Sequence, residues 1–319
     1  MNDEYTRRTF LETAGKAVVS GMASFLLPPY LGSMAFASDS RLPTTTDVRR
    51  KNLADLLLDL ELAYGRNGAI PSTREPDTKS RCIARLERIA ESFERMTTPL
   101  IRANLQHRRF HGIGTQEAQG LLLSLDRAIT SSGLQQPPQG IGISYLTQGL
   151  LGSMVDCDIY SFVALGIAER YGIPLYGVES PIHFFTRWQS PSIHLNFDQG
   201  LIRESDQRYI DGSMFNPPTA RISEGSITRG AYLRSLRKQE TVAIHLVNIA
   251  MSLLDNHEYE TALDLTTLAT RWAPHSTYTH LGRSSVLSSF RRPVEALDEY
   301  RRAVELDPTR PARTFYIGF

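Results

Sequence analysis

The segment Cys157–Tyr171 constrains the fold of this chain most, because it is apolar on nearly every side between residues 159 and 168. A surface helix carries one apolar stripe, whereas a helix that is apolar all round must be covered on all sides. Asp156 precedes the segment as a candidate N-cap, and Gly172 and Pro174 end it. Three short β-like runs follow, spaced for an antiparallel meander: 173–178, 183–188 and 193–197. The pattern predicts an α+β fold, with one buried helix on a small antiparallel sheet.

Helical periodicity dominates the chain before this segment. Residues 47–65, 81–96 and 116–129 each carry apolar side chains at the spacing of an amphipathic helix. Residues 131–142 are rich in proline, glutamine and glycine, which predicts a loop. We therefore predict a helical section over 47–139 that serves as packing scaffold, followed by a core domain over 140–238.

An internal repeat marks the last part of the chain. The triplet Ala-Leu-Asp at 262–264 recurs at 296–298, a displacement of 34 residues, and Ala269 and Pro274 recur at the same displacement as Ala303 and Pro308. This is the length of a tetratricopeptide repeat, so we predict tetratricopeptide-like (TPR-like) helical repeats over 239–319. Two such repeats cannot bury their own apolar faces, and they should dock on the preceding domain through a joining helix near 243–254.

The N-terminus resembles a twin-arginine export signal. Arg7 and Arg8 are followed by Phe10 and Leu11, then by an apolar stretch interrupted by proline, glycine and serine, and then by a small-x-small cleavage site at 35–37. The resemblance implies a signal peptide over 1–37, a linker over 38–46, and a periplasmic or secreted protein. We expect no integral membrane span after cleavage, because the apolar stretch is too broken to serve as one. An uncleaved amphipathic helix is the alternative.

Charge and cysteine content narrow the classes of partner and cofactor. Lys and Arg number 35 against 34 Asp and Glu, which argues against nucleic acid or anionic lipid as the main partner. Cys82 and Cys157 are too few for a disulfide scaffold and form no CxxC pair, although one disulfide between them remains open. His107 and His111 could share a helix face, but the arginines between them favour a solvated face over a metal site. We predict no cofactor and no metal.

The candidate chemistry lies in Cys157, His183 and Asp198. A cysteine in the first turn of a helix lies where backbone N–H groups and the helix dipole favour a thiolate, which is a nucleophile. His183 begins one predicted strand and Asp198 follows the next, so an antiparallel pair can set the carboxylate beside the imidazole. In such a thiol triad the cysteine attacks a carbonyl, the histidine transfers the proton, and the aspartate fixes its tautomer. Backbone N–H groups at the helix start would form the oxyanion hole.

The third position of the triad has two candidates. Asn196 and Asp198 project from the same face of one strand, and either could orient His183. Asp198 is favoured because a carboxylate stabilises imidazolium better than an amide does. The alternative without chemistry is that Cys157 is an inert core residue.

These residues lie in segments that resemble the transglutaminase-like, papain-like core of the SirB1-type family. The segments are 156–161 (DCDIYS), 168–178 (AERYGIPLYGV) and 181–188 (PIHFFTRW). A helical section before the core and TPR-like repeats after it are also similar to that family's layout. The resemblance implies the fold more than the activity, because several members of the family lack the cysteine.

Two functional hypotheses follow from the sequence. The first is an exported thiol enzyme that acts on amide or peptide bonds through an acyl-enzyme, as a hydrolase or as an acyl transferase, with a protein or peptide as substrate. The second is a non-catalytic binding module of the periplasm, whose TPR-like groove holds a peptide segment of a partner. The presence of Cys157 and His183 favours the first.

Overall fold

The structure, a computed structural model, describes residues 42–65, 69–98, 102, 105, 110, 112–136, 145–213 and 221–309. The predicted signal peptide and residues 38–41 of the predicted linker lie outside the described residues, as do His107 and His111. All elements described below belong to one compact unit, Ser40–Phe319.

The first part of the unit is helical, as the periodicity predicts, but the single helix expected over 47–65 is two helices. Lys51 is extended and ends the first of them, and the side-chain oxygen of Asn52 accepts a hydrogen bond from Ala54 N (3.0 Å) at the start of the second. The Asn52 amide also donates to Gly166 O (2.8 Å). A tertiary contact that the local sequence does not reveal therefore fixes the break. The elements are α2 (Thr45–Arg50), α3 (Leu53–Gly65), the 3₁₀ turn η1 (Pro71–Thr73), α4 (Thr78–Met96), α6 (Thr115–Ser131) and α7 (Leu146–Leu151).

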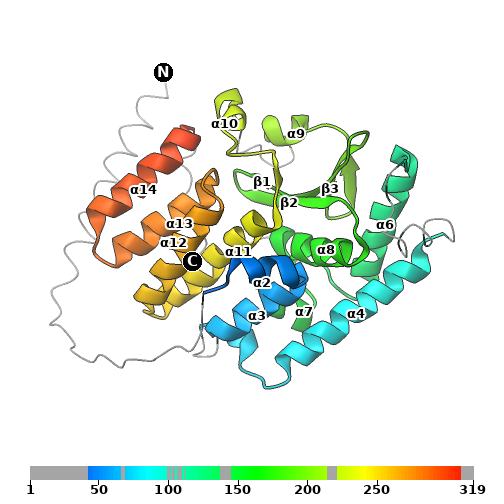
Figure 1. Cartoon of the computed structure of the whole chain (residues 1–319), viewed down its shortest axis with the longest axis horizontal. Coiled ribbons are helices and arrows are strands. Elements are labelled where there is room, and N and C mark those ends of the chain that lie inside the picture. Colours follow the sequence, from blue (N-terminus) through cyan, green and yellow to red (C-terminus); the bar gives the residue numbers. More distant parts are fainter. Residues whose placement is uncertain are drawn as a thin grey trace. The chain divides into compact units, whose positions relative to one another are not determined.

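The central helix α8 spans Cys157–Tyr171, the bounds that its apolar pattern predicts. The side chain of Asp156 caps it by accepting a hydrogen bond from Ile159 N (3.3 Å), and Gly172 ends it in the left-handed conformation (φ 72°). The helix packs against β1 (Leu175–Ser180) and β2 (His183–Gln189), as Figure 1 shows. The predicted burial of this helix is confirmed.

Five antiparallel strands form the sheet, in the order β4-β3-β2-β1-β5. The predicted meander is confirmed for β1, β2 and β3 (His194–Asp198), while β4 (Leu201–Arg203) and β5 (Ser235–Leu236) were not predicted. One face of the sheet joins the large core around α8, with Phe184 5.4 Å from Phe162 between ring centroids. The other face forms a smaller core with residues from and around α9 (Gln207–Ile210) and α10 (Glu224–Thr228).

The chain ends in paired helices. α11 (Lys238–Asp255) pairs with α12 (Tyr259–Trp272), and α13 (Thr277–Ser289) pairs with α14 (Pro293–Leu306). The alanines that recur at the 34-residue displacement are all buried: Ala262, Ala269, Ala296 and Ala303. A side chain at Gly282 would collide with Val247, which shows how closely α13 approaches α11. α11 also contacts α2, α3 and β1, so the paired helices pack on the rest of the unit.

The predicted fold class is thus confirmed as α+β: N-terminal helices, a five-stranded antiparallel sheet packed against helices, and paired helices at the C-terminal end. Within the described ranges, no helix has both the length and the apolar character needed to cross a bilayer.

Candidate functional site

Cys157 occupies the first position of α8, and its side chain is partly exposed. The hydroxyl of Ser161 lies 2.7 Å from the carbonyl oxygen of Cys157 and 3.4 Å from that of Phe184, and it can donate to both. Phe184 follows His183 in β2, so this buried serine ties the first turn of α8 to the start of the strand that carries the histidine. The sequence offered no signal for this role of Ser161.

His183 begins β2 directly after the Pro181–Ile182 turn, and Ser180 donates a hydrogen bond to its carbonyl oxygen (3.2 Å). The imidazole Nε2 lies 2.8 Å from Oδ2 of Asp198. The ring is also hydrogen-bonded to the side chain of Cys157. The structure therefore brings the three predicted residues into one hydrogen-bonded chain.

The electrostatics of His183 favour its protonated form. Burial lowers the pKa of the imidazole, but hydrogen bonds to Asp198 and Cys157, together with their negative charges, outweigh burial and raise this pKa to about 10. A protonated imidazole beside Cys157 places a positive charge and a transferable proton next to its sulfur. The first turn of α8 adds backbone N–H groups and the positive end of the helix dipole at the same place.

Asp198 ends β3, where a tight turn leads into β4. Gln199 and Gly200 both have positive φ (47° and 85°), the conformation of a two-residue hairpin turn whose twist suits the flanking strands. The Asp198 side chain is 8% exposed. Its Oδ2 also accepts a hydrogen bond from the hydroxyl of Tyr209 (3.2 Å). A buried carboxylate with two donors on one oxygen has little freedom to rotate away from His183.

Tyr209 is a site residue that sequence reasoning missed. It lies in the short helix α9, its ring stacks on Phe185 at 4.0 Å between centroids, and it is 3% exposed. Burial, followed by the charge of Asp198, raises its pKa, so the hydroxyl remains a donor. A helix of one turn leaves no periodic pattern, and the only available signal was an aromatic residue in a polar stretch after the strands.

Asn196, the alternative orienter, takes part in a different network. Its Oδ1 accepts from Nε of Arg187 (2.7 Å), and its Nδ2 donates to Oδ1 of Asp206 (2.6 Å). Arg187 is 2% exposed and also donates to Asp206 (2.6 Å) and to the carbonyl oxygen of Leu233 (2.6 Å). This network holds Asp206, the residue before α9, and with it the segment that carries Tyr209.

The environment of the second cysteine, Cys82, differs from that of Cys157. Cys82 lies in α4, it is fully buried, and burial raises the pKa of its thiol to about 12. Both cysteines are free, so the alternative of a disulfide between them is wrong for this structure.

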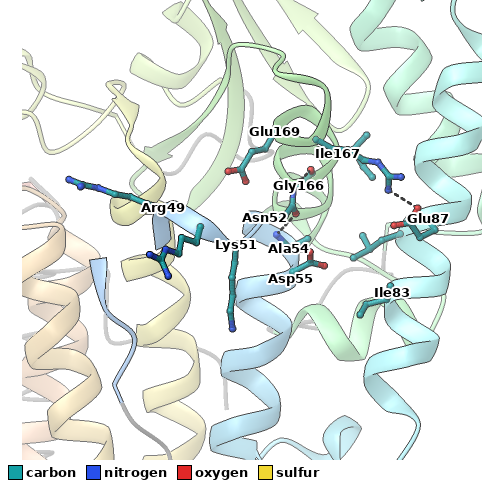
Figure 2. A pocket seen from close by; sticks show the side chains of 13 residues that line it. Arg49, Lys51, Asn52, Ala54, Asp55, Ile83, Glu87, Gly166, Ile167 and Glu169 are labelled. Atoms are coloured by element: carbon teal, nitrogen blue, oxygen red, sulfur yellow. Dashed lines mark hydrogen bonds and ion pairs between the residues drawn. The ribbon is translucent and has the colours of Figure 1, made fainter. Parts of the chain in front are cut away.

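The described residues contain no group of three His, Cys, Asp or Glu side chains that could hold a metal ion. A cavity of about 430 Å³ lies near the C-terminal end of α8, and Figure 2 shows it beside the α2–α3 junction. Its wall mixes charges of both signs, and most of them are paired, as in Arg170 with Glu87 (2.6 Å) and Lys238 with Glu169 (2.6 Å). Cys157 does not line this cavity.

Comparison with known proteins adds no assignment. No family model matches the chain, and no curated protein matches it.

Proposed function

We propose that this protein is a transglutaminase-like thiol enzyme that acts on amide or peptide bonds through an acyl-enzyme. One observation carries the proposal: His183 is hydrogen-bonded to Asp198 and to Cys157 at the same time, and its pKa is raised to about 10. A buried core cysteine needs no such partner. The partial exposure of Cys157 also supports the proposal, because a nucleophile has to meet its substrate.

The geometry supports a two-step reaction. In the first step, the Cys157 thiolate attacks the substrate carbonyl carbon, and backbone N–H groups of the first turn of α8 stabilise the oxyanion. The His183 imidazolium gives its proton to the leaving nitrogen as the C–N bond breaks and the thioester remains. In the second step, water or an amine attacks the thioester, His183 takes the proton of the attacking group, and the S–C bond breaks. Hydrolysis and acyl transfer thus differ only in the acceptor.

The location and partners proposed here follow from the sequence. The twin-arginine-like N-terminus supports a periplasmic or secreted protein, and the neutral charge balance supports a protein or peptide substrate rather than nucleic acid. Peptide binding by the TPR-like helices gains no specific support, because α11 is buried over most of its length, against α12 and α13 and also against α2 and α3.

The test is a comparison of the two thiols in the folded protein. We expect iodoacetamide near pH 7 to label Cys157 much faster than Cys82, with the labelled site read by peptide mass spectrometry. We also expect p-nitrophenyl acetate to give a burst of p-nitrophenol equal to the enzyme concentration, followed by slower turnover that hydroxylamine, as an amine acceptor, accelerates. Equally slow labelling of both thiols, with no burst, would overturn the proposal.

A further inference from the structure

The side chain of Asn248 connects the C-terminal helix α11 to the first turn of α8. Its Nδ2 donates a hydrogen bond to Oδ2 of Asp158 (2.9 Å), the residue after Cys157. Its Oδ1 accepts a hydrogen bond from the hydroxyl of Tyr278 in α13 (2.6 Å). Asn248 is 7% exposed. Two C-terminal helices, α11 and α13, therefore meet the distant helix α8 beside the candidate nucleophile.

These contacts fix which way the Asn248 amide faces. A tyrosine hydroxyl that donates to the amide oxygen leaves the NH₂ group to face the carboxylate. The hydroxyl of Tyr145 donates a hydrogen bond to the main-chain carbonyl oxygen of Asn248 (3.4 Å), which ties the backbone of α11 at this position. The hydrogen bond from the amide holds the Asp158 carboxyl in one place.

Asp158 is in turn bonded to the residue that caps α8. Its side chain is hydrogen-bonded to that of Asp156, the N-cap. Burial first, and then Asp156, raise the pKa of Asp158 well above its ordinary value. The pair brackets Cys157 in sequence, and a shift of either carboxyl changes the charge beside the sulfur.

We infer that Asn248, held by Tyr278, is a positioning residue of the thiol site, so that the C-terminal helices form part of the active site. The inference rests on the proposed function, because a positioning role requires that Cys157 is a nucleophile. Its test, however, measures the reactivity of the Cys157 thiol directly. It gives the paired helices a role in the reaction that differs from binding a partner. A change in the packing of α13 would then be felt at Cys157 through two hydrogen bonds.

The isosteric variant Asn248→Asp separates positioning from mere packing. At acid pH the new carboxyl is protonated and can still donate to Asp158, whereas at higher pH it is ionised and repels the carboxyl pair. The titratable groups that face it are Asp156, Asp158 and Cys157 from α8, Tyr278 from α13 and Tyr145 before α7. His245 lies one turn earlier on α11 and pairs with Glu61 of α3.

The experiment measures the rate of iodoacetamide labelling of Cys157 in the full chain between pH 5 and pH 9. We expect Asn248→Asp to label about 10-fold more slowly than wild type at pH 8, with the deficit closing as the pH falls. Tyr278→Phe, which frees the amide to rotate, should slow labelling about threefold. Tyr259→Phe is the control, because it removes a hydroxyl of the same helical part that bonds to His257. It should label like wild type.

Two outcomes would overturn the inference. One is a wild-type labelling profile in a folded Asn248→Asp variant, and the other is a deficit of the same size at every pH, which is what a packing defect produces. If Asn248→Asp fails to fold by circular dichroism, Tyr278→Phe decides, and wild-type labelling of that variant overturns the inference. Failure of the proposed function is a separate result, since it would appear as labelling without p-nitrophenyl acetate turnover in wild type.

Discussion

The two ends of α8 offer a comparison between a chemical site and a mere cavity. At the N-terminal end, Cys157, His183 and Asp198 form a hydrogen-bonded chain with the histidine and aspartate side chains 9% and 8% exposed. At the C-terminal end, a cavity of about 430 Å³ is lined by side chains such as Arg170 and Glu169, whose charges are paired and lie near solvent. The cavity therefore lies at the C-terminal end of α8, whereas the buried, hydrogen-bonded titratable groups lie at its N-terminal end.

The difference teaches that convergent, buried, hydrogen-bonded groups indicate function better than empty space does. Burying His183 and Asp198 costs free energy unless each satisfies the other, and such pairs shift the pKa of the histidine. Exposed ion pairs such as Arg170–Glu87 contribute little to the free energy of unfolding, and salt screens them. The following predictions test whether the two ends of α8 really differ in this way.

The largest effect is expected from Cys157→Ala. Removal of the nucleophile should lower p-nitrophenyl acetate turnover at least about 1,000-fold and abolish the burst. Its matched control is Cys82→Ala, which removes the other thiol, in α4. That variant should keep the burst, although loss of a fully buried side chain lowers its melting temperature. A burst that survives in Cys157→Ala would show that another group is acylated.

The second prediction concerns Asp198→Asn. The amide keeps the size of the carboxyl but removes its charge, so the pKa of His183 should fall from about 10. Turnover near pH 7 should fall by roughly 100-fold to 10,000-fold, as for other triads that lose this charge. The measurement is the pH dependence of turnover and of Cys157 labelling.

The sign of that pH dependence is fixed by the direction of the shift. In wild type the raised pKa means that imidazolium is present at neutral pH and is lost as the pH rises through about 10. The pair likewise stabilises the fold below the unfolded pKa of about 6.5, and this contribution disappears as the pH rises through about 10. In Asp198→Asn the pH above which turnover declines should move to a lower value, and this decline is the alkaline limb of the pH profile. An alkaline limb at the wild-type pH would show that Asp198 does not act through His183.

The third prediction concerns Tyr209→Phe, which keeps the ring on Phe185 but removes the hydrogen bond to Asp198. One hydrogen bond to a charged group accounts for a loss of about 10-fold in turnover. A carboxylate with one donor fewer is more basic, so the alkaline limb should move slightly upward, opposite to its movement in Asp198→Asn. A pH profile identical to that of wild type, with full turnover, would reduce Tyr209 to a packing residue.

Sequence patterns were most informative where one segment carries its own signal. The apolar run predicted the burial of α8, and its bounds, Cys157–Tyr171, were found because Asp156 and Gly172 mark its two ends. The strand runs were found within two residues of their bounds, which set His183 at the start of β2 and Asp198 at the end of β3. Strand alternation alone could not choose between Asn196 and Asp198, which lie on the same face.

Partners that come from distant elements could not be predicted. Tyr209 reaches Asp198 from a single turn of helix, and Ser161 is a small polar residue inside an apolar run. Asn248 meets Asp158 across 90 residues of sequence. Each depends on how the elements pack, and no spacing along one element encodes that. For the same reason the break at Asn52 was missed, since Gly166 of α8 helps to fix it.

The smallest effect on activity is expected at the cavity end of α8, from Gly166→Ala. A Cβ at Gly166 would lie 2.6 Å from Cβ of Ala54, so α3 and α8 must move apart, and the stability should fall by roughly 1–3 kcal/mol. The matched control is Gly120→Ala in α6, where a Cβ meets nothing within 4 Å and should stabilise the helix by about 0.5–1 kcal/mol. Below the melting temperature, both variants should keep the labelling rate and pH profile of wild type within about twofold, because surface and packing changes far from a site leave its local charges unaltered. If Gly166→Ala instead shifted the pH profile of Cys157 labelling, the two ends of α8 would be energetically coupled. The conclusion that the cavity is independent of the thiol site would then be wrong.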